Sequence, residues 1–181
     1  MLKRPIAISL SPNTEYDDVM TAIKIFLQPW LWKEGTAIMK VEQWFCHYFG
    51  SNTAVSFNSA RSALYSLLKA FDIGRGDEVL IQAFTCVAVA DPIIWAGAKP
   101  VFVDVDDSLN IDFGLLERHI TSKTKAIIVQ HTFGIPANLK KITEIAQKYN
   151  IRLIEDCAHS LGGRYQGKKL GLFGDASFFS F

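Results

Sequence analysis

The amino-acid sequence predicts an α/β fold: a mostly parallel sheet with helices on both of its faces. From residue 53 onward, short β-branched or apolar runs alternate with segments of helical periodicity, a rhythm typical of parallel strands joined by helical crossovers. Of the 181 residues, 49% are hydrophobic and 20% are charged, which suits strands that are buried on both faces. The length fits one domain of ordinary size.

Helices are expected first, in a helical segment over residues 14–49, because apolar residues recur there at intervals of three and four in Asp17–Leu27 and Thr36–Phe49. Five strands and a last apolar run then follow, and four helical segments separate the five strands. The strands are Thr53–Phe57, Glu78–Gln82, Pro100–Asp104, Lys125–Gln130 and Ile151–Glu155, the last run is Ala176–Phe181, and the helices are Arg61–Phe71, Thr85–Trp95, Phe113–Ile120 and Leu139–Tyr149. No turn or polar tail follows the last run, so we expect the chain to stop inside an element of a larger domain.

Charge and cysteine content argue against several classes of protein. Nineteen basic and 18 acidic residues give a net charge of +1, so no overall field favours nucleic acid or an anionic membrane. The most apolar window, residues 79–98, contains Gln82, Asp91 and Pro92, which are poorly placed in a membrane-spanning helix. Three widely spaced cysteines form no Cys-x-x-Cys pair, so neither a disulfide framework nor a zinc ribbon is expected. This cysteine content predicts a cytoplasmic protein.

Ligands of open parallel sheets bind beyond the carboxyl ends of the strands, and two such places draw attention. The small residues after the first predicted strand, Asn58–Leu64, open a helix whose free backbone amides could bind a phosphate; alternatively, Asn58 or Ser59 only caps that helix. Asp156 and His159 follow the fifth strand three residues apart. A carboxylate there could keep a pyridinium nitrogen protonated, or it could be an ordinary cap.

Other polar groups have plainer interpretations. Cys157 next to His159 could form a nucleophile or a metal site, but no further ligands are suitably spaced, so no metal is expected. Asp104, Asp106 and Asp107 more readily cap a loop than bind a cation, and His131 can be a hydrogen-bonded structural histidine. No dinucleotide-binding glycine motif and no P-loop occurs in the sequence.

The order of these pieces resembles one family, the DegT/DnrJ/EryC1/StrS sugar aminotransferases of the aspartate aminotransferase fold type. The resemblance covers nearly the whole chain. It is carried by an ordered series of motifs, Asn58–Leu64, Gly76–Val79, Ala83–Cys86, Gly97–Asp106, Asn110–Asp112, Thr124–Ile127, His131–Pro136, Ile154–His159, Gly171–Asp175 and Ser177–Phe181.

The resemblance implies a pyridoxal 5'-phosphate (PLP) site. The family's Glu-Asp-x-Ala-His motif implies that Asp156 pairs with the pyridine nitrogen and that His159 contacts the ring oxygen. It also implies that the phosphate binds the backbone amides of Ala60 and Arg61 and the hydroxyl of Ser180. Cofactor binding and catalysis would thus rest on one cluster of residues.

Two departures from the family pattern affect this expectation. Many members have an aromatic residue where this sequence has Cys86, although a thiol still offers a thin, polarizable contact to the ring. The Schiff-base lysine is expected a few residues past Phe181, so residues 1–181 are expected to be an inactive amino-terminal part of the large domain, without the small carboxyl-terminal domain.

The implied reaction is transfer of an amino group from an amino acid to a nucleotide-linked keto sugar. The resemblance implies glutamate as the amino-acid donor. Two alternatives stay open. Some relatives carry histidine at the lysine position and dehydrate the sugar instead, and the chain could also be a degenerate module without turnover. The resemblance further implies a homodimer.

Overall fold

The computed structural model describes residues 14–32, 36–51 and 53–181. The chain divides into two compact units, with the boundary between Val55 and Ser56. Within the described residues, no helix is both long and apolar enough to span a membrane.

The first unit is helical. It contains α1 (Tyr16–Phe26), a 3-10 turn (Pro29–Leu31) and α2 (Thr36–Phe49), and neither α-helix has a buried residue. The predicted periodicity locates both helices to within one residue. A capping box begins α1, where the Glu15 amide donates to Asp18 Oδ2 at 2.9 Å.

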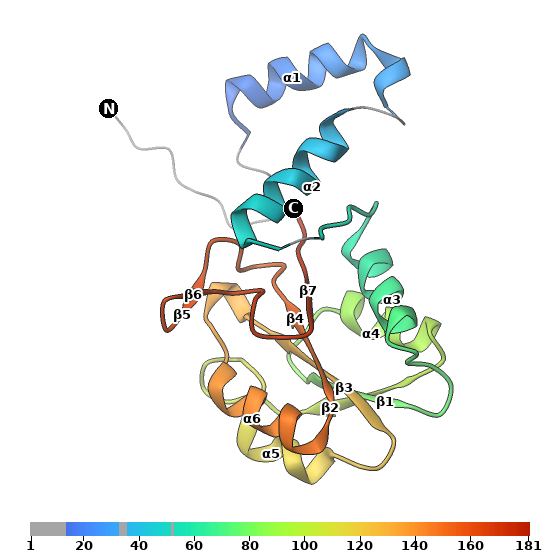
Figure 1. Cartoon of the computed structure of the whole chain (residues 1–181), viewed down its shortest axis with the longest axis vertical. Coiled ribbons are helices and arrows are strands. Elements are labelled where there is room, and N and C mark those ends of the chain that lie inside the picture. Colours follow the sequence, from blue (N-terminus) through green and yellow to red (C-terminus); the bar gives the residue numbers. More distant parts are fainter. Residues whose placement is uncertain (1–13, 33–35, 52) are drawn as a thin grey trace. The chain divides into compact units, whose positions relative to one another are not determined.

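The second unit is built on a parallel sheet. Its five strands stand in the order β2-β1-β3-β4-β7, and every neighbouring pair is parallel. Figure 1 shows the strands running through the middle of this unit. Their bounds are β1 Glu78–Gln82, β2 Lys99–Val103, β3 Thr124–Gln130, β4 Arg152–Asp156 and β7 Ala176–Phe178.

Helices cover both faces of this sheet, as predicted. Alternate strand residues separate into two hydrophobic clusters, because successive side chains of a strand point to opposite faces. One cluster contains Ile154 of β4 with residues of α3 (Ala60–Ala70) and α4 (Val87–Trp95). The other contains Leu153 with residues of α5 (Phe113–His119) and α6 (Leu139–Tyr149). The sheet is therefore buried between two helical layers (Figure 1).

Two parts of the chain differ from the prediction. Residues 53–57, expected to form the first strand, are not assigned to any strand; a strand exists only where a neighbour completes its ladder. A short hairpin of β5 (Arg164–Tyr165) and β6 (Lys168–Lys169) was not foreseen. Its two-residue turn, Gln166-Gly167, has positive φ at both positions, 49° and 83°, as a type I′ turn requires.

Candidate functional site

The carboxyl ends of β3, β4 and β7 bring Asp156 and Ser180, two of the predicted site residues, to the same end of the sheet. Gln130 at the end of β3 pairs in register with Asp156 at the end of β4, and Asp156 pairs with Phe178 at the end of β7. Ser180 follows Phe178 by two residues. This edge is where ligands of open parallel sheets bind.

Strand alternation sends the two neighbouring acids of β4 to opposite faces. Asp156 lies on the face of Ile154, toward α3 and α4, whereas Glu155 lies on the face of Leu153, toward α6. Both side chains are buried. Asp156 and Glu155 therefore take part in two separate polar sites, one on each side of the sheet.

Asp156 is a buried carboxylate with few partners. The Ala158 amide donates to Oδ1 at 3.0 Å, and no second hydrogen bond reaches the carboxylate from the described residues. Burial raises the pKa of Asp156, although the Ala158 amide and the two nearby histidines, His159 and His131, oppose that shift. Such a group gains most from a cationic partner, because an opposite charge offsets desolvation. Its chemistry therefore fits a protonated ring nitrogen.

His159 stands outside the core and is held by an aromatic contact. Its ring is exposed and stacks on Phe133, with centroids 5.8 Å apart and an interplanar angle of 8°. Phe84 meets Phe133 edge-on at 6.4 Å. The sequence interpretation did not select Phe84 or Phe133 as site residues, although both lie in the motifs that carry the resemblance. The positive φ of Phe133, 52°, is a backbone signal that only the structure reveals.

The beginning of α3 offers free amides, as expected. Ser59 caps the helix by accepting a hydrogen bond from the Ser62 amide at 3.2 Å. The amides of Ala60 and Arg61, the first two helical residues, have no acceptor within the helix. The cap and the phosphate interpretations are therefore compatible, because Ser59 satisfies a different amide.

The other two cofactor candidates, Cys86 and Ser180, are both exposed. Cys86 is the residue before α4, and its side chain makes no capping hydrogen bond. Thr85 beside it donates to Gln130 Oε1 at 2.7 Å, which ties this loop to the end of β3. Cys86 therefore follows directly after a residue that is hydrogen-bonded to the end of β3.

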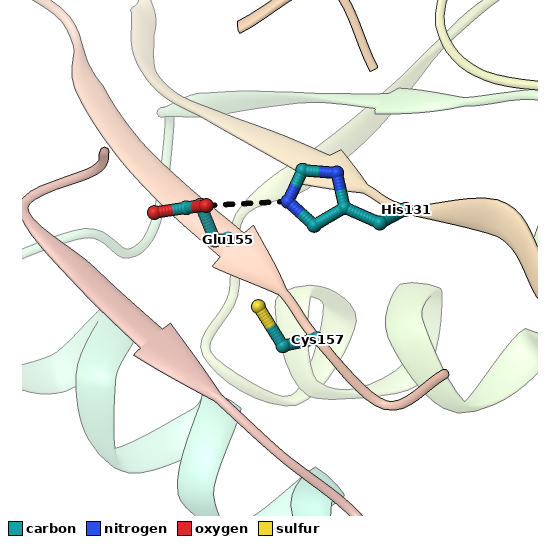
Figure 2. A group of neighbouring side chains, drawn as sticks. All are labelled: His131, Glu155 and Cys157. Atoms are coloured by element: carbon teal, nitrogen blue, oxygen red, sulfur yellow. Dashed lines mark hydrogen bonds and ion pairs between the residues drawn. The ribbon is translucent and has the colours of Figure 1, made fainter. Parts of the chain in front are cut away.

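The opposite face carries a buried cluster of three possible metal ligands, His131, Glu155 and Cys157 (Figure 2). His131 Nε2 lies 3.2 Å from Glu155 Oε2, and both side chains are 0% exposed. Burial raises the pKa of Cys157 well above its ordinary range, and the nearby Glu155 adds to the shift. A thiol must be deprotonated to bind a metal, and the contact that joins His131 to Glu155 in this cluster is a hydrogen bond.

The acidic residues after β2 serve the local backbone. Asp106 accepts from the Ser108 amide at 2.8 Å and from its hydroxyl, while Asp104 accepts from the Val105 amide at 2.9 Å. Asp112 caps α5 through the Gly114 amide. The capping interpretation of this loop agrees with these contacts.

Comparison with known proteins gives a consistent result. The model of the DegT/DnrJ/EryC1/StrS aminotransferase family matches residues 13–181. The chain is 39% identical over 166 residues to a UDP-N-acetyl-3-dehydro-alpha-D-glucosamine 3-aminotransferase of Acidithiobacillus ferrooxidans, covering 91% of this chain and 45% of that protein. It is also 39% identical over 153 residues to the GDP-perosamine synthase of Caulobacter vibrioides, covering 84% of this chain and 41% of that protein.

Solved structures agree with this result. The Streptococcus pneumoniae protein Spr1654, solved in a PLP form, superposes with a TM-score of 0.85 at 30% identity, covering 96% of this chain and 48% of that one. The chain therefore spans about half the length of the relatives it matches. A family match over nearly every residue, with the same fold, leads to one conclusion. The chain belongs to the DegT/DnrJ/EryC1/StrS aminotransferase family.

Proposed function

We propose that this chain forms the amino-terminal, cofactor-binding part of an enzyme that transfers an amino group from an amino acid to a nucleotide-linked keto sugar. The observation that carries the proposal is Asp156, a buried carboxylate with one hydrogen bond at the carboxyl edge of the sheet. The relatives named above act on UDP- and GDP-linked sugars according to their names, which supports a nucleotide-linked substrate.

The chain's residues fit PLP as the cofactor. When bound, PLP supplies an electron sink for the bond changes at the amino-acid carbon. Asp156 would hold the proton on the ring nitrogen, since a carboxylate in a buried site strongly favours a cationic partner. His159 would hydrogen-bond the ring oxygen, and the stacked Phe133 would keep its imidazole oriented.

The phosphate would bind at the other end of the site. The amides of Ala60 and Arg61 open α3, where the helix dipole favours an anion, and the Ser180 hydroxyl would add a donor from the strand end. Cys86 would contact the ring in place of the aromatic residue of many relatives. Glutamate as donor, a homodimer, and a Schiff-base lysine beyond Phe181 complete the proposal and rest on the family resemblance.

The proposal is tested with the full-length protein. We expect PLP to bind, and purified enzyme to convert a nucleotide-linked keto sugar and glutamate to the amino sugar, observed by mass spectrometry. The Asp156→Asn variant should retain the cofactor but lose turnover by about 10²-fold or more, because an unprotonated pyridine is a poor electron sink. Asp107→Asn, an exposed aspartate, is the matched control and should behave as wild type.

Two results would contradict this proposal. Turnover of Asp156→Asn close to that of wild type would remove Asp156 from the mechanism. A dehydrated sugar as product, with no nitrogen incorporated, would assign the enzyme to the dehydratases of the family instead.

A further inference from the structure

We propose that Glu155 is a positioning residue that sets the location of Ser180 by holding the loop between β6 and β7. This role rests on the proposed function, in which Ser180 is a ligand of the cofactor phosphate. Glu155 belongs to the buried network on the face of β4 opposite Asp156 (Figure 2).

The Glu155 carboxylate gathers three backbone amides from one irregular loop. The Gly171 amide donates to Oε2 at 2.9 Å, and the amides of Phe173 and Gly174 donate to Oε1 at 2.6 and 2.8 Å. The loop has no regular secondary structure at residues 171–175, so Glu155 supplies acceptors that a strand or helix would otherwise provide. Glu155 therefore anchors three residues of this loop.

His131 is the fourth donor to this carboxylate, and its partners define its tautomer. The Ala137 amide donates to His131 Nδ1 at 3.3 Å, so Nδ1 is the accepting nitrogen and Nε2 carries the proton toward Glu155. Burial alone would raise the pKa of Glu155, but the bonds from His131 and the loop amides outweigh it and hold the pKa below its usual range. Glu155 is thus a buried carboxylate that accepts hydrogen bonds from His131 and from three loop amides.

From the loop, the chain passes directly into β7 with little freedom. The Asp175 amide donates to the Leu153 carbonyl at 2.7 Å, and the Leu153 amide donates to Asp175 Oδ2 at 2.8 Å. A Cβ on Gly174 would lie 2.5 Å from the Leu153 carbonyl oxygen, so the loop presses against β4. Glu155 and these contacts together specify where β7 begins.

The starting point of β7 decides where Ser180 lies. The strand pairs with β4 from Ile154↔Ala176 to Asp156↔Phe178, and the Cys157 amide donates to the Phe178 carbonyl at 2.9 Å. A slip of one residue would move Ser180 by about 3.3 Å and turn its side chain to the other face of the sheet. Register here therefore sets both the position of Ser180 and the burial of Phe178.

The test is a double-mutant cycle in the full-length protein. It compares Glu155→Gln, Ser180→Ala and the double variant, with PLP and with pyridoxal, which lacks the phosphate, as probes. Glutamine keeps the shape of Glu155, but its NH2 group replaces one accepting oxygen and would face the hydrogen-bond donors of the loop and His131. We expect faster hydrogen exchange in the peptide over residues 170–180 and roughly tenfold weaker PLP binding, the lower range for one hydrogen bond to a charged group.

The dependence on Ser180 and on the phosphate separates positioning from general damage. In the Ser180→Ala background, Glu155→Gln should weaken PLP binding by less than about twofold. With serine at position 180, Glu155→Gln should change the binding of pyridoxal equally little. Glu144→Gln, at an exposed position of α6, controls for the chemical change, and the core variant Ile142→Val controls for lost stability. Neither control should alter the preference for PLP over pyridoxal.

Several outcomes would overturn the inference. Equal losses in both backgrounds, or for both probes, would show that Glu155 acts on the fold and not through Ser180. If Glu155→Gln does not fold, His131→Asn removes one donor and should give a smaller loss with the same dependence on Ser180; an additive loss there also overturns the inference. Wild-type protein that binds no PLP would refute the proposed function itself, whereas tight wild-type binding with an additive cycle refutes only this role.

Discussion

At the scale of single residues, Glu155 and Asp156 show how one strand gives two adjacent acids opposite properties. Burial acts on both and raises the pKa of a carboxyl group. Glu155 receives four donors, which hold its pKa below the usual value, whereas Asp156 receives one amide bond and its pKa stays above it. The difference comes from the faces on which they lie, since alternation directs only Glu155 to the 171–174 loop.

This difference predicts an unusual stability change. The folded pKa of Asp156 lies above its unfolded value of about 3.9, so its contribution to stability declines as pH rises from the unfolded to the folded pKa. Asp156→Asn should therefore stabilise the cofactor-free protein at pH 7, by roughly 0.5–2 kcal/mol, and change it little near pH 3. Thermal unfolding of both proteins across this pH range checks the sign. A lower unfolding temperature of the variant at pH 7 would contradict it.

Ser180 allows a second prediction at this scale. Its hydroxyl is exposed beyond β7, so removing it should cost little folding stability. Ser180→Ala in the full-length protein should weaken PLP binding by about 1.5–3 kcal/mol, the usual loss for one hydrogen bond to a charged group. Titration of the cofactor absorbance measures this loss. Unchanged affinity would mean that Ser180 does not bind the phosphate.

At the scale of elements, the close approach of the 171–175 loop to β4 depends on Gly174. A methyl group there would meet the Leu153 carbonyl oxygen at 2.5 Å, and backbone atoms cannot move aside cheaply. Gly174→Ala should lower the free energy of unfolding by about 1–3 kcal/mol. Denaturant unfolding measures this change.

Gly114→Ala is the matched control for this prediction. Its new Cβ would meet the side chain of Asp112 at 3.1 Å, and a side chain can adjust more easily than backbone. The control should therefore lose much less stability than Gly174→Ala. Equal losses would mean that the contact with Leu153 is not responsible.

Elements also differ in how well local sequence predicts them. The bounds of α2, α6 and β1 agree with the prediction to the residue, because hydrophobic periodicity is a local signal. Residues 53–57 have the composition of a strand but are not assigned to one, because composition cannot supply a pairing neighbour. Hydrophobic alternation does not predict the β5–β6 hairpin, because each of its strands has only two residues.

At the scale of the whole molecule, the family fold makes a prediction about activity. We expect the polypeptide of residues 1–181 by itself to show no turnover, because the family resemblance implies a Schiff-base lysine beyond Phe181. Lys168 and Lys169 lie in the small hairpin of β5 and β6, and the family resemblance gives neither of them a role at the cofactor. Borohydride reduction with PLP, followed by peptide mapping, should find only scattered, low-yield labelling. Stoichiometric labelling of one lysine together with turnover would contradict this expectation.

Sequence alone was sufficient for the α/β class, the parallel sheet between helical layers, the family and the strand-end position of Asp156. These features follow from periodicity and motif order, which are properties of neighbouring residues. Only the tertiary structure revealed the stacking of Phe133 on His159 and the amides that converge on Glu155. Those contacts join residues that are 16 to 26 positions apart, and their geometry depends on strand register and loop path, which no local pattern in the chain encodes.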